Sequence, residues 1–308
     1  MEIYLPIADL PVNVLVILAM GLAVGFISGM FGIGGGFLMT PLLIFLGISP
    51  AVAVASVTGH IAASSMSGAI SYWRRRAIDI ALCFMLLAGG IIGTASGVWL
   101  FTFLREIGQL DITIGLSYVL LLSIVGALMV AEGVRAIIRA RQGKPVELRR
   151  PGSHMWIHGL PFKLRFKRSR IYVSAIPVWG IGFIIGFVGA IRGIGGGFLL
   201  VPMLIYLLRV PTATVIGTSM VLTLVTMASA TVMHAATNHL VDALLALILM
   251  VGGVVGAQFG ARAGQKMRGE RLRLLLGILV LAVGIRFALN LVLTPDSLYS
   301  IRPADTDT

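Results

Sequence analysis

The sequence predicts an all-α integral membrane protein with two inverted repeats of about five helical segments each, one segment per repeat being short and broken or re-entrant. Three observations predict this class. The 308 residues are 58% hydrophobic and only 12% charged, with a mean hydropathy of +1.00. The sequence Gly-Ile-Gly-Gly-Gly-Phe-Leu occurs at residues 32–38 and again at 193–199. In the first half, Lys and Arg concentrate in the loop after the third apolar segment, whereas in the second half they concentrate in the loop after the fourth.

The glycine motif indicates a duplicated unit. At the same spacing of 161 residues, Gly25-Phe26 recurs as Gly186-Phe187, and Pro41 recurs as Pro202. Self-similarity at a fixed spacing is typical of a repeated structural unit. Glycine has no Cβ and proline has no backbone N–H, so the chain around each motif cannot continue as an unbroken helix. Such breaks at matching places in two hydrophobic halves point to the binding site of a transporter.

Ten apolar segments follow one another along the chain. They lie at residues 12–30, 37–48, 51–72, 80–104 and 112–138, and then at 172–191, 198–208, 212–234, 241–261 and 272–293. A membrane-spanning helix needs about 20 residues, so the second segment of each repeat should form a hairpin with the segment before it. We expect a first membrane repeat (1–138), a basic cytoplasmic linker (139–171), a second membrane repeat (172–295) and an acidic C-terminal tail (296–308).

The basic residues predict the topology. Arg74-Arg75-Arg76 follows the third segment, whereas the corresponding loop of the second half, 235–240, has no Lys or Arg. The next loop of the first half has only Arg105, whereas residues 262–273 contain five basic residues. Lys and Arg stay on the cytoplasmic side, so the repeats should be inverted in the membrane. Residues 1–11 lack Lys and Arg, so we expect the first apolar segment to be retained rather than removed as a signal peptide.

Both breaks should face protein or a water-filled cavity, because unpaired backbone is not tolerated against lipid. Each short segment begins directly after its break, so its free N–H groups and the positive end of its dipole point there. Helix ends of this kind bind anions. The alternative is that the glycines only permit a tight turn. The predicted substrate-binding glycines are Gly34, Gly35, Gly36, Gly195, Gly196 and Gly197.

Further candidate residues lie near the breaks. Arg192 directly precedes the second motif; a cation within a span is costly, and guanidinium suits oxyanions, although it could instead be a structural partner. His60 lies near mid-span and could couple proton movement to transport, or simply bond a neighbouring helix. Hydroxyl groups are dense in the third and eighth segments, where they line a path or join helices. From these we select Ser56, Thr58, Thr218 and Ser219.

Several classes of function are disfavoured. A single cysteine, Cys83, excludes a disulfide framework or a thiolate metal site. The sequence contains no Walker, nucleophile-elbow, HExxH or haem motif. We therefore expect no catalytic residues, cofactor or metal, and no enzyme activity. The net charge of +12 suits lipid head groups better than nucleic acid. The expected partners are a small anion, membrane lipids and either a proton or sodium as coupling ion; a homodimer is left open.

These motifs resemble the sulfite exporter TauE/SafE family of membrane permeases. The resemblance rests on Gly25-Phe26, Gly29, residues 32–38 with Pro41, their second-half copies, and the glycine-rich spans that begin at Asp79 and Asp242. It implies export or uptake of sulfite, sulfoacetate or other organosulfonates across the bacterial cytoplasmic membrane. The leading hypothesis is a secondary transporter that works by alternating access about the two breaks. The alternatives are a membrane-embedded assembly or signalling scaffold that uses the basic linker, and an anion channel.

Overall fold

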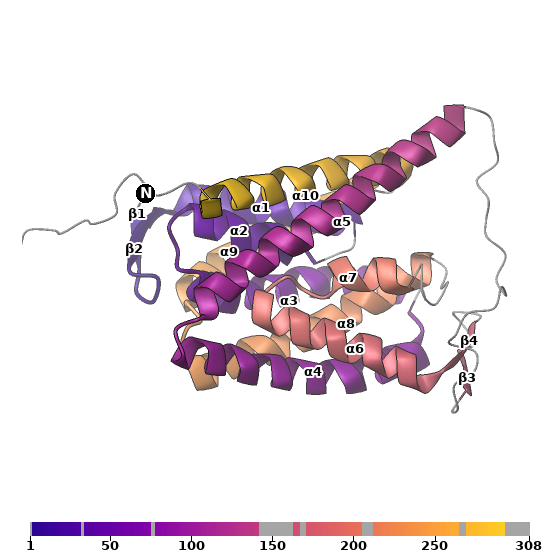
Figure 1. Cartoon of the computed structure of the whole chain (residues 1–308), viewed down its shortest axis with the longest axis horizontal. Coiled ribbons are helices and arrows are strands. Elements are labelled where there is room, and N and C mark those ends of the chain that lie inside the picture. Colours follow the sequence, from indigo (N-terminus) through magenta and orange to yellow (C-terminus); the bar gives the residue numbers. More distant parts are fainter. Residues whose placement is uncertain are drawn as a thin grey trace, which may run out of the picture.

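The structure, a computed structural model, describes residues 2–31, 34–74, 78–141, 163–166, 171–204, 212–264 and 269–292. These residues are mostly helical (Figure 1). The helices of the first half are α1 (Val14–Phe31), α2 (Gly36–Phe45), α3 (Pro50–Arg74), α4 (Ile80–Glu106) and α5 (Leu110–Arg141). Those of the second half are α6 (Ala175–Arg192), α7 (Gly197–Pro202), α8 (Thr212–Met233), the π-helix η3 (His234–Asn238), α9 (Ala243–Gly264) and α10 (Gly269–Val292). Each of the ten predicted segments overlaps one of these α-helices.

Five of the described helices are long and apolar enough to cross a membrane. They are α4, α5, α6, α8 with its π-helical end, and α9. Shorter apolar stretches lie in α1, α2 and α10. The 25-residue α3 carries many hydroxyl and glycine residues, which lower its hydropathy. The prediction of a helical, multi-pass membrane protein is confirmed, whereas the predicted domain boundaries stay predictions.

Two short β-hairpins were not expected from the sequence. In one, β1 (Glu2–Leu5) pairs antiparallel with β2 (Leu10–Asn13), and in the other β3 (Lys163–Phe166) pairs with β4 (Ile171–Ser174). Leu5 is fully buried, and the backbone N–H of Ile7 donates to Asp242 Oδ2 at 3.1 Å, so the first hairpin is attached to the start of α9. Most of the predicted linker and all of the predicted C-terminal tail lie outside the described residues.

Two close parallel pairs of helices each contain one helix from either half of the chain. α1 packs along α9, and α4 packs along α6. A Cβ added to Gly25 would lie 2.4 Å from the carbonyl oxygen of Gly253, and one added to Gly186 would lie 2.1 Å from that of Gly90. Any larger residue would push these helices apart, so small residues allow the backbones to approach within the membrane.

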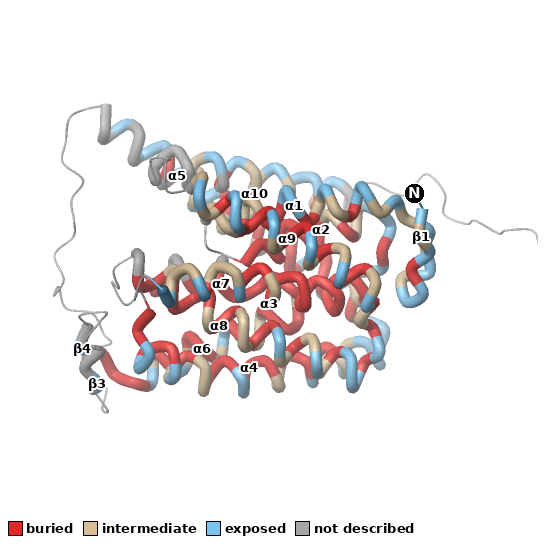
Figure 2. The backbone as a smooth tube through the Cα atoms, turned by 180° about the vertical axis from the view of Figure 1, so that it is seen from behind, coloured by how far each residue is buried: buried red, intermediate tan, exposed pale blue. Residues whose placement is uncertain are grey.

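The third helices of the two repeats, α3 and α8, cross at the centre and run antiparallel. The hydroxyl of Thr231, late in α8, donates to that of Thr58, early in α3, at 2.8 Å. At the opposite end of the pair, Gly68 lies against Met220. The fifth helices, α5 and α10, pair along one edge of the molecule (Figure 1). Figure 2 shows that the buried residues concentrate in the helices between this pair and the α4–α6 pair.

Corresponding aspartates begin the fourth helix of each repeat. Asp79 Oδ1 accepts a hydrogen bond from the backbone N–H of Leu82 at 3.2 Å, and Asp242 Oδ1 accepts one from that of Leu245 at 3.0 Å. A carboxylate at this position satisfies an N–H group that has no partner within its own helix and complements the positive end of the helix dipole. The repeated aspartates therefore act as helix caps within the protein core.

Candidate functional site

The first glycine motif breaks the chain between α1 and α2. Gly34 and Gly35 have φ angles of +86° and +66°, a left-handed conformation that residues with a Cβ rarely adopt. Gly35 occupies the N-cap position of α2, and its carbonyl oxygen accepts from the backbone N–H of Leu38 at 3.1 Å. The backbone N–H of Gly36 is held by the carbonyl oxygen of Gly34 at 2.9 Å. The glycines thus reverse the chain in a tight turn just before a ten-residue helix.

The second motif repeats this geometry between α6 and α7. Gly193 ends α6 in the left-handed conformation, with φ +60°, and its N–H donates to the carbonyl oxygen of Gly189 at 2.9 Å. Gly195 has φ +66°, and Gly196 takes the N-cap position of α7. One left-handed glycine falls at the same place in both motifs, since Gly34 and Gly195 are separated by the repeat spacing. The motifs differ one residue later, where Gly35 is left-handed and Gly196 has a φ angle of −33°.

The two breaks contact each other. A Cβ added to Gly34 would lie 3.6 Å from the carbonyl oxygen of Gly195, and one added to Gly195 would lie 3.6 Å from that of Gly34. A Cβ on Gly36 would lie 2.4 Å from the carbonyl oxygen of Gly193, to which the Thr40 hydroxyl also donates at 3.3 Å. The sequence-predicted glycines from both halves are therefore brought together, and they are buried.

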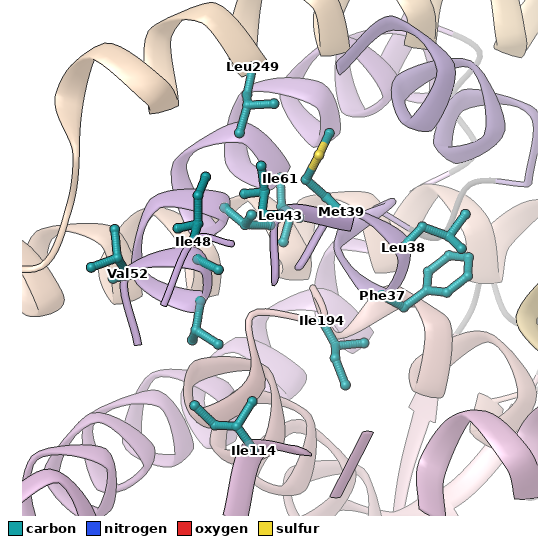
Figure 3. Close-up of a cluster of buried hydrophobic side chains, with 14 of the residues drawn as sticks. Phe37, Leu38, Met39, Leu43, Ile48, Val52, Ile61, Ile114, Ile194 and Leu249 are labelled. Atoms are coloured by element: carbon teal, nitrogen blue, oxygen red, sulfur yellow. The ribbon is translucent and has the colours of Figure 1, made fainter. Parts of the chain in front are cut away.

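An apolar cluster surrounds the contact. Phe37 at the start of α2, Ile194 in the second break and Ile61 of α3 are fully buried (Figure 3). Ile61 lies directly against both breaks, because its side-chain carbons would meet a Cβ on Gly34, Gly36 or Gly195. A side chain at Gly36 or Gly195 would therefore collide with Ile61, at 2.2 and 2.6 Å, and one at Gly36 would also collide with the carbonyl oxygen of Gly193.

The four predicted hydroxyl residues all have partners within the protein. The hydroxyls of Ser56 and Thr218 accept from the backbone N–H groups of Asp242 and Asp79, at 3.0 and 3.4 Å. They therefore link each third helix to the start of the fourth helix of the other repeat. Hydroxyls of Thr58 and Ser219 donate to backbone carbonyls one turn earlier in their own helices, at 2.6 and 2.8 Å.

His60 is fully buried but faces α9 rather than the breaks. Its Nδ1 lies 2.7 Å from the carbonyl oxygen of Leu249, and a Cβ on Gly253 would lie 2.1 Å from its Cε1. The other ring nitrogen, Nε2, has no hydrogen-bond partner in the described part of the chain. His60 thus joins α3 to α9 and retains one unused polar atom.

Arg192 is the last residue of α6, directly before the second break, and is half-buried. Its carbonyl oxygen accepts a hydrogen bond from the hydroxyl of Tyr118 in α5 at 2.5 Å. Within the described ranges, its guanidinium forms no hydrogen bond or ion pair. The positive charge is therefore held beside the break by its backbone, without a carboxylate partner among these residues.

A cavity of about 750 Å³ lies between α1, α3, α8 and α9. It is lined by Gly29 of α1, by Ser64 and Arg74 of α3, and by Gln258 and Arg262 of α9. The glycines of the two breaks do not line it. Ser64 is nevertheless only three residues along α3 from Ile61, so the inner end of the cavity lies within one helical turn of the breaks.

The comparison with known families decides what kind of protein carries this arrangement. A profile of the family described as Sulfite exporter TauE/SafE matches residues 17–287. The chain belongs to this family. Family membership, and with it the prediction of a multi-pass protein of the cell membrane, is confirmed.

Two bacterial relatives match over nearly the whole chain, and a plant protein matches over a short part of it. The "Probable membrane transporter protein YjnA" of Bacillus subtilis (strain 168) is 27% identical over 273 residues, 88% of this chain and 98% of that protein. A "Probable membrane transporter protein" of Xylella fastidiosa (strain 9a5c) is 29% identical over 283 residues, 89% and 94% of the two chains. "Sulfite exporter TauE/SafE family protein 1" of Arabidopsis thaliana is 43% identical over 60 residues, 20% and 13% of the two chains. No solved structure matches the chain.

Two residues that the sequence analysis did not select complete the candidate site. The hydroxyls of Ser65 and Thr223 are buried and have no hydrogen-bond partner in the described part of the chain. Thr223 lies against the first break, because a Cβ on Gly34 would be 3.3 Å from its Cγ2. Buried polar atoms without partners are uncommon and indicate a functional role or a bound ligand. No signal in the sequence separates these two hydroxyls from the others of α3 and α8.

The described residues contain no group of three or more His, Cys, Asp or Glu side chains that could hold a metal ion. The candidate site therefore combines the N-terminal end of α2, buried hydroxyls and one arginine. Its chemistry suits the binding of a small anion by hydrogen bonds and charge.

Proposed function

We propose that the protein is a secondary transporter, not an enzyme, and that it carries a small sulfur-containing oxyanion such as sulfite, sulfoacetate or another organosulfonate across the cytoplasmic membrane. The description of its family and the names of its relatives support a membrane transporter of this substrate class. The observation that carries the proposal is the buried contact between the breaks, in which Gly34 of one repeat meets Gly195 of the other. Transporters with internal repeats bind substrate where such breaks meet.

The chemistry of the breaks favours an anion. Backbone N–H groups at the start of α2 and the dipole of this helix provide positive potential, and the unpaired hydroxyls of Ser65 and Thr223 can donate hydrogen bonds to oxygen atoms. The close approach of Gly36 to Gly193 leaves no room for a ligand there. We therefore expect the oxyanion beside Gly34 and Gly195, with Arg192 contributing charge.

The direction of corresponding helices supports inverted repeats. In two repeats of the same orientation, α3 and α8 would run in the same direction. Instead Thr58 meets Thr231 while Gly68 meets Met220, so the two helices run antiparallel. The fifth helices α5 and α10 also run antiparallel. A two-fold axis in the membrane plane relates repeats in this way.

Labelling of introduced cysteines tests the orientation. Arg74 and His239 are exposed at the ends of α3 and of the π-helix, and inversion requires these ends to lie on opposite sides of the membrane. In a Cys83→Ala background, we expect an impermeant thiol reagent to label Arg74→Cys only from the cytoplasmic side and His239→Cys only from outside. Labelling of both positions from the same side would contradict the inverted arrangement.

The two sides of the centre differ, which supports alternating access. The cavity opens at Arg74 and Arg262, the ends that the positive charge assigns to the cytoplasm. The corresponding space in the other repeat is filled by Ala190, Val98 and Ala230, which are at most 2% exposed.

Polar contacts reinforce this filled side. His234 Nε2 lies 3.1 Å from the carbonyl oxygen of Ala190, and the Thr102 hydroxyl donates to Asn238 Oδ1 at 3.0 Å. Arg105 donates to the carbonyl oxygen of Asn238 at 2.9 Å. These contacts tie α8 and its π-helical end to α4 and α6, as expected for a state that is closed to the outside.

For coupling we propose a proton or sodium. The unpaired Nε2 of His60 supports the proton, because a buried imidazole nitrogen without a partner can accept one. Its position against α9 also connects such a change to the α1–α9 pair.

Counterflow of a labelled sulfonate or sulfite in proteoliposomes tests the function. A carrier gives saturable exchange, whereas a scaffold gives neither saturation nor exchange. We expect Arg192→Ala to abolish exchange while the protein still reaches the membrane, and Arg135→Ala, on the exposed surface of α5, to exchange like the wild type. Unchanged exchange by Arg192→Ala would remove this residue from the mechanism, and the absence of exchange by the wild type would refute the proposal.

A further inference from the structure

We propose that the cavity between α1, α3, α8 and α9 is a second, peripheral anion-binding site, in which Arg74 and Arg262 attract a small oxyanion before it reaches the glycine breaks. This inference rests on the proposed function, because it assumes an anionic substrate. The two arginines line the cavity together with Gly29 and Ser64. The cavity therefore joins the surface to the neighbourhood of the breaks.

The lining of the cavity is complementary to an anion. Among the residues that the structure describes, it contains two arginines, one glutamine and several hydroxyls, but no Asp or Glu. Within the described ranges, neither the Arg74 nor the Arg262 guanidinium forms a hydrogen bond or ion pair, and both residues are exposed. Guanidinium groups without a protein partner can bind oxyanions through paired hydrogen bonds.

A stripe of hydroxyl residues along α3 marks a path inward. Ser64, Ser67, Ser71 and Arg74 follow one another at intervals of three or four residues and all line the cavity. Side chains at this spacing share one face of a helix. Ser67 and Ser71 provide hydroxyl donors on this face, whereas the hydroxyl of Ser64 donates to the carbonyl oxygen of Ile61 at 3.1 Å. The stripe thus ends one turn from Ile61, which lies against both breaks.

The other repeat provides an internal contrast. There Ala190 replaces Gly29 at the corresponding position and is buried with Val98 and Ala230. The basic residue at that end, Arg105, is engaged with the backbone of Asn238 at 2.9 Å. On one side, the space is filled and its arginine is bonded to the backbone. On the other side, two arginines line an open cavity.

The apolar part of the lining limits the kind of anion. Met66, Ile70 and Met220 line the same cavity as the arginines and serines. Methionine side chains adapt to apolar groups of different shape. The site therefore suits an oxyanion group attached to a short apolar chain at least as well as a bare inorganic anion.

Charge-selective thiol modification tests the site without any transport assay. In a Cys83→Ala background, Ser71→Cys is modified from the cytoplasmic side by an anionic and by a cationic methanethiosulfonate reagent, and the ratio of the two rates is measured. A unit charge about 5 Å away in water changes the two rates roughly fourfold in opposite directions, and therefore their ratio about 16-fold, so replacing both arginines by Gln should lower the ratio of anionic to cationic rates by more than about tenfold. Replacement by Lys should preserve the ratio, and so should Arg135→Gln, on exposed α5.

The outcomes separate the two proposals. A ratio that is independent of Arg74 and Arg262, or the absence of modification from the cytoplasmic side, would overturn the anion site. A ratio that depends on these arginines and that falls with added salt, as screening requires, supports it. Because the readout is a rate of modification, this support stands even if counterflow of sulfonates fails, in which case only the proposed function is refuted.

Discussion

At the residue scale, Gly36 tests the contact between the two breaks. Its backbone is not in the left-handed region, so a side chain causes no conformational strain there. A Cβ would nevertheless lie 2.2 Å from Ile61 Cδ1 and 2.4 Å from the carbonyl oxygen of Gly193. The second of these neighbours is backbone and cannot move without displacing the second break.

We predict that Gly36→Ala lowers the free energy of unfolding by about 1–3 kcal/mol, the usual cost of overpacking, and strongly reduces exchange. Gly180→Ala, where an added Cβ meets nothing within 4 Å, should leave both unchanged. Thermal unfolding in detergent and exchange in proteoliposomes measure the two effects. Normal stability and exchange in Gly36→Ala would show that the breaks do not need to touch.

The glycine positions were predictable from the sequence because the same seven residues occur twice, and only a shared backbone requirement explains a repeated run of glycine. The roles of the hydroxyls were not predictable. Ser56 and Thr218 contact backbone N–H groups 186 and 139 residues away, and no local pattern indicates such contacts. Ser65 and Thr223 differ from neighbouring hydroxyls only in lacking a partner in the described part of the chain.

At the element scale, the helix starts at Asp79 and Asp242 are repeated features that the sequence identified only as starts of spans. Asp242 Oδ1 accepts from the backbone N–H groups of Leu244 and Leu245, and its Oδ2 accepts from that of Ile7. One carboxylate thus caps α9 and attaches the β1–β2 hairpin.

We predict that Asp242→Ala destabilises the protein by about 1–2 kcal/mol, the cost of losing an N-cap. Asp242→Asn retains one oxygen acceptor and should lose much less. Denaturant or thermal unfolding measures both variants. Equal losses in the two variants would mean that the charge, and not the cap geometry, stabilises this helix start.

The long helices were predictable because a helix needs about 20 residues to cross the bilayer, and apolar runs of about this length are visible in the sequence. The β1–β2 hairpin was not, since its strands are four residues each and their pairing depends on the contact with Asp242. The crossing of α3 and α8 was also not predictable, because the pattern of apolar residues indicates where a helix lies in the sequence but not which helix it packs against.

At the scale of the whole molecule, the two sides of the centre are unequal although the repeats correspond. On the side that we propose faces outward, the side chain of Asn238 accepts from Thr102 and contacts His234 Nδ1 at 3.2 Å. The side that we propose faces the cytoplasm contains the cavity. Alternating access requires that the filled side opens and the side with the cavity closes during transport.

We predict that Asn238→Ala shifts the protein toward the outward-open state, because it removes contacts that hold only the closed outer side. Ala230 is fully buried together with Val98 and Ala190. A cysteine in place of Ala230 should then react faster with an external thiol reagent. Ser96→Ala, which removes only a bond within exposed α4, serves as the control. An unchanged reaction rate in Asn238→Ala would exclude this network as a gate.

Equilibrium binding of a radiolabelled sulfonate or sulfite to the purified protein tests the central claim most directly, because it depends on neither transport nor topology and because Gly36→Ala alters the glycine breaks alone. The account predicts saturable binding by the wild type and by Gly180→Ala, and binding by Gly36→Ala that is weakened by an order of magnitude or more. Binding of equal strength by all three proteins, or by none of them, would contradict it.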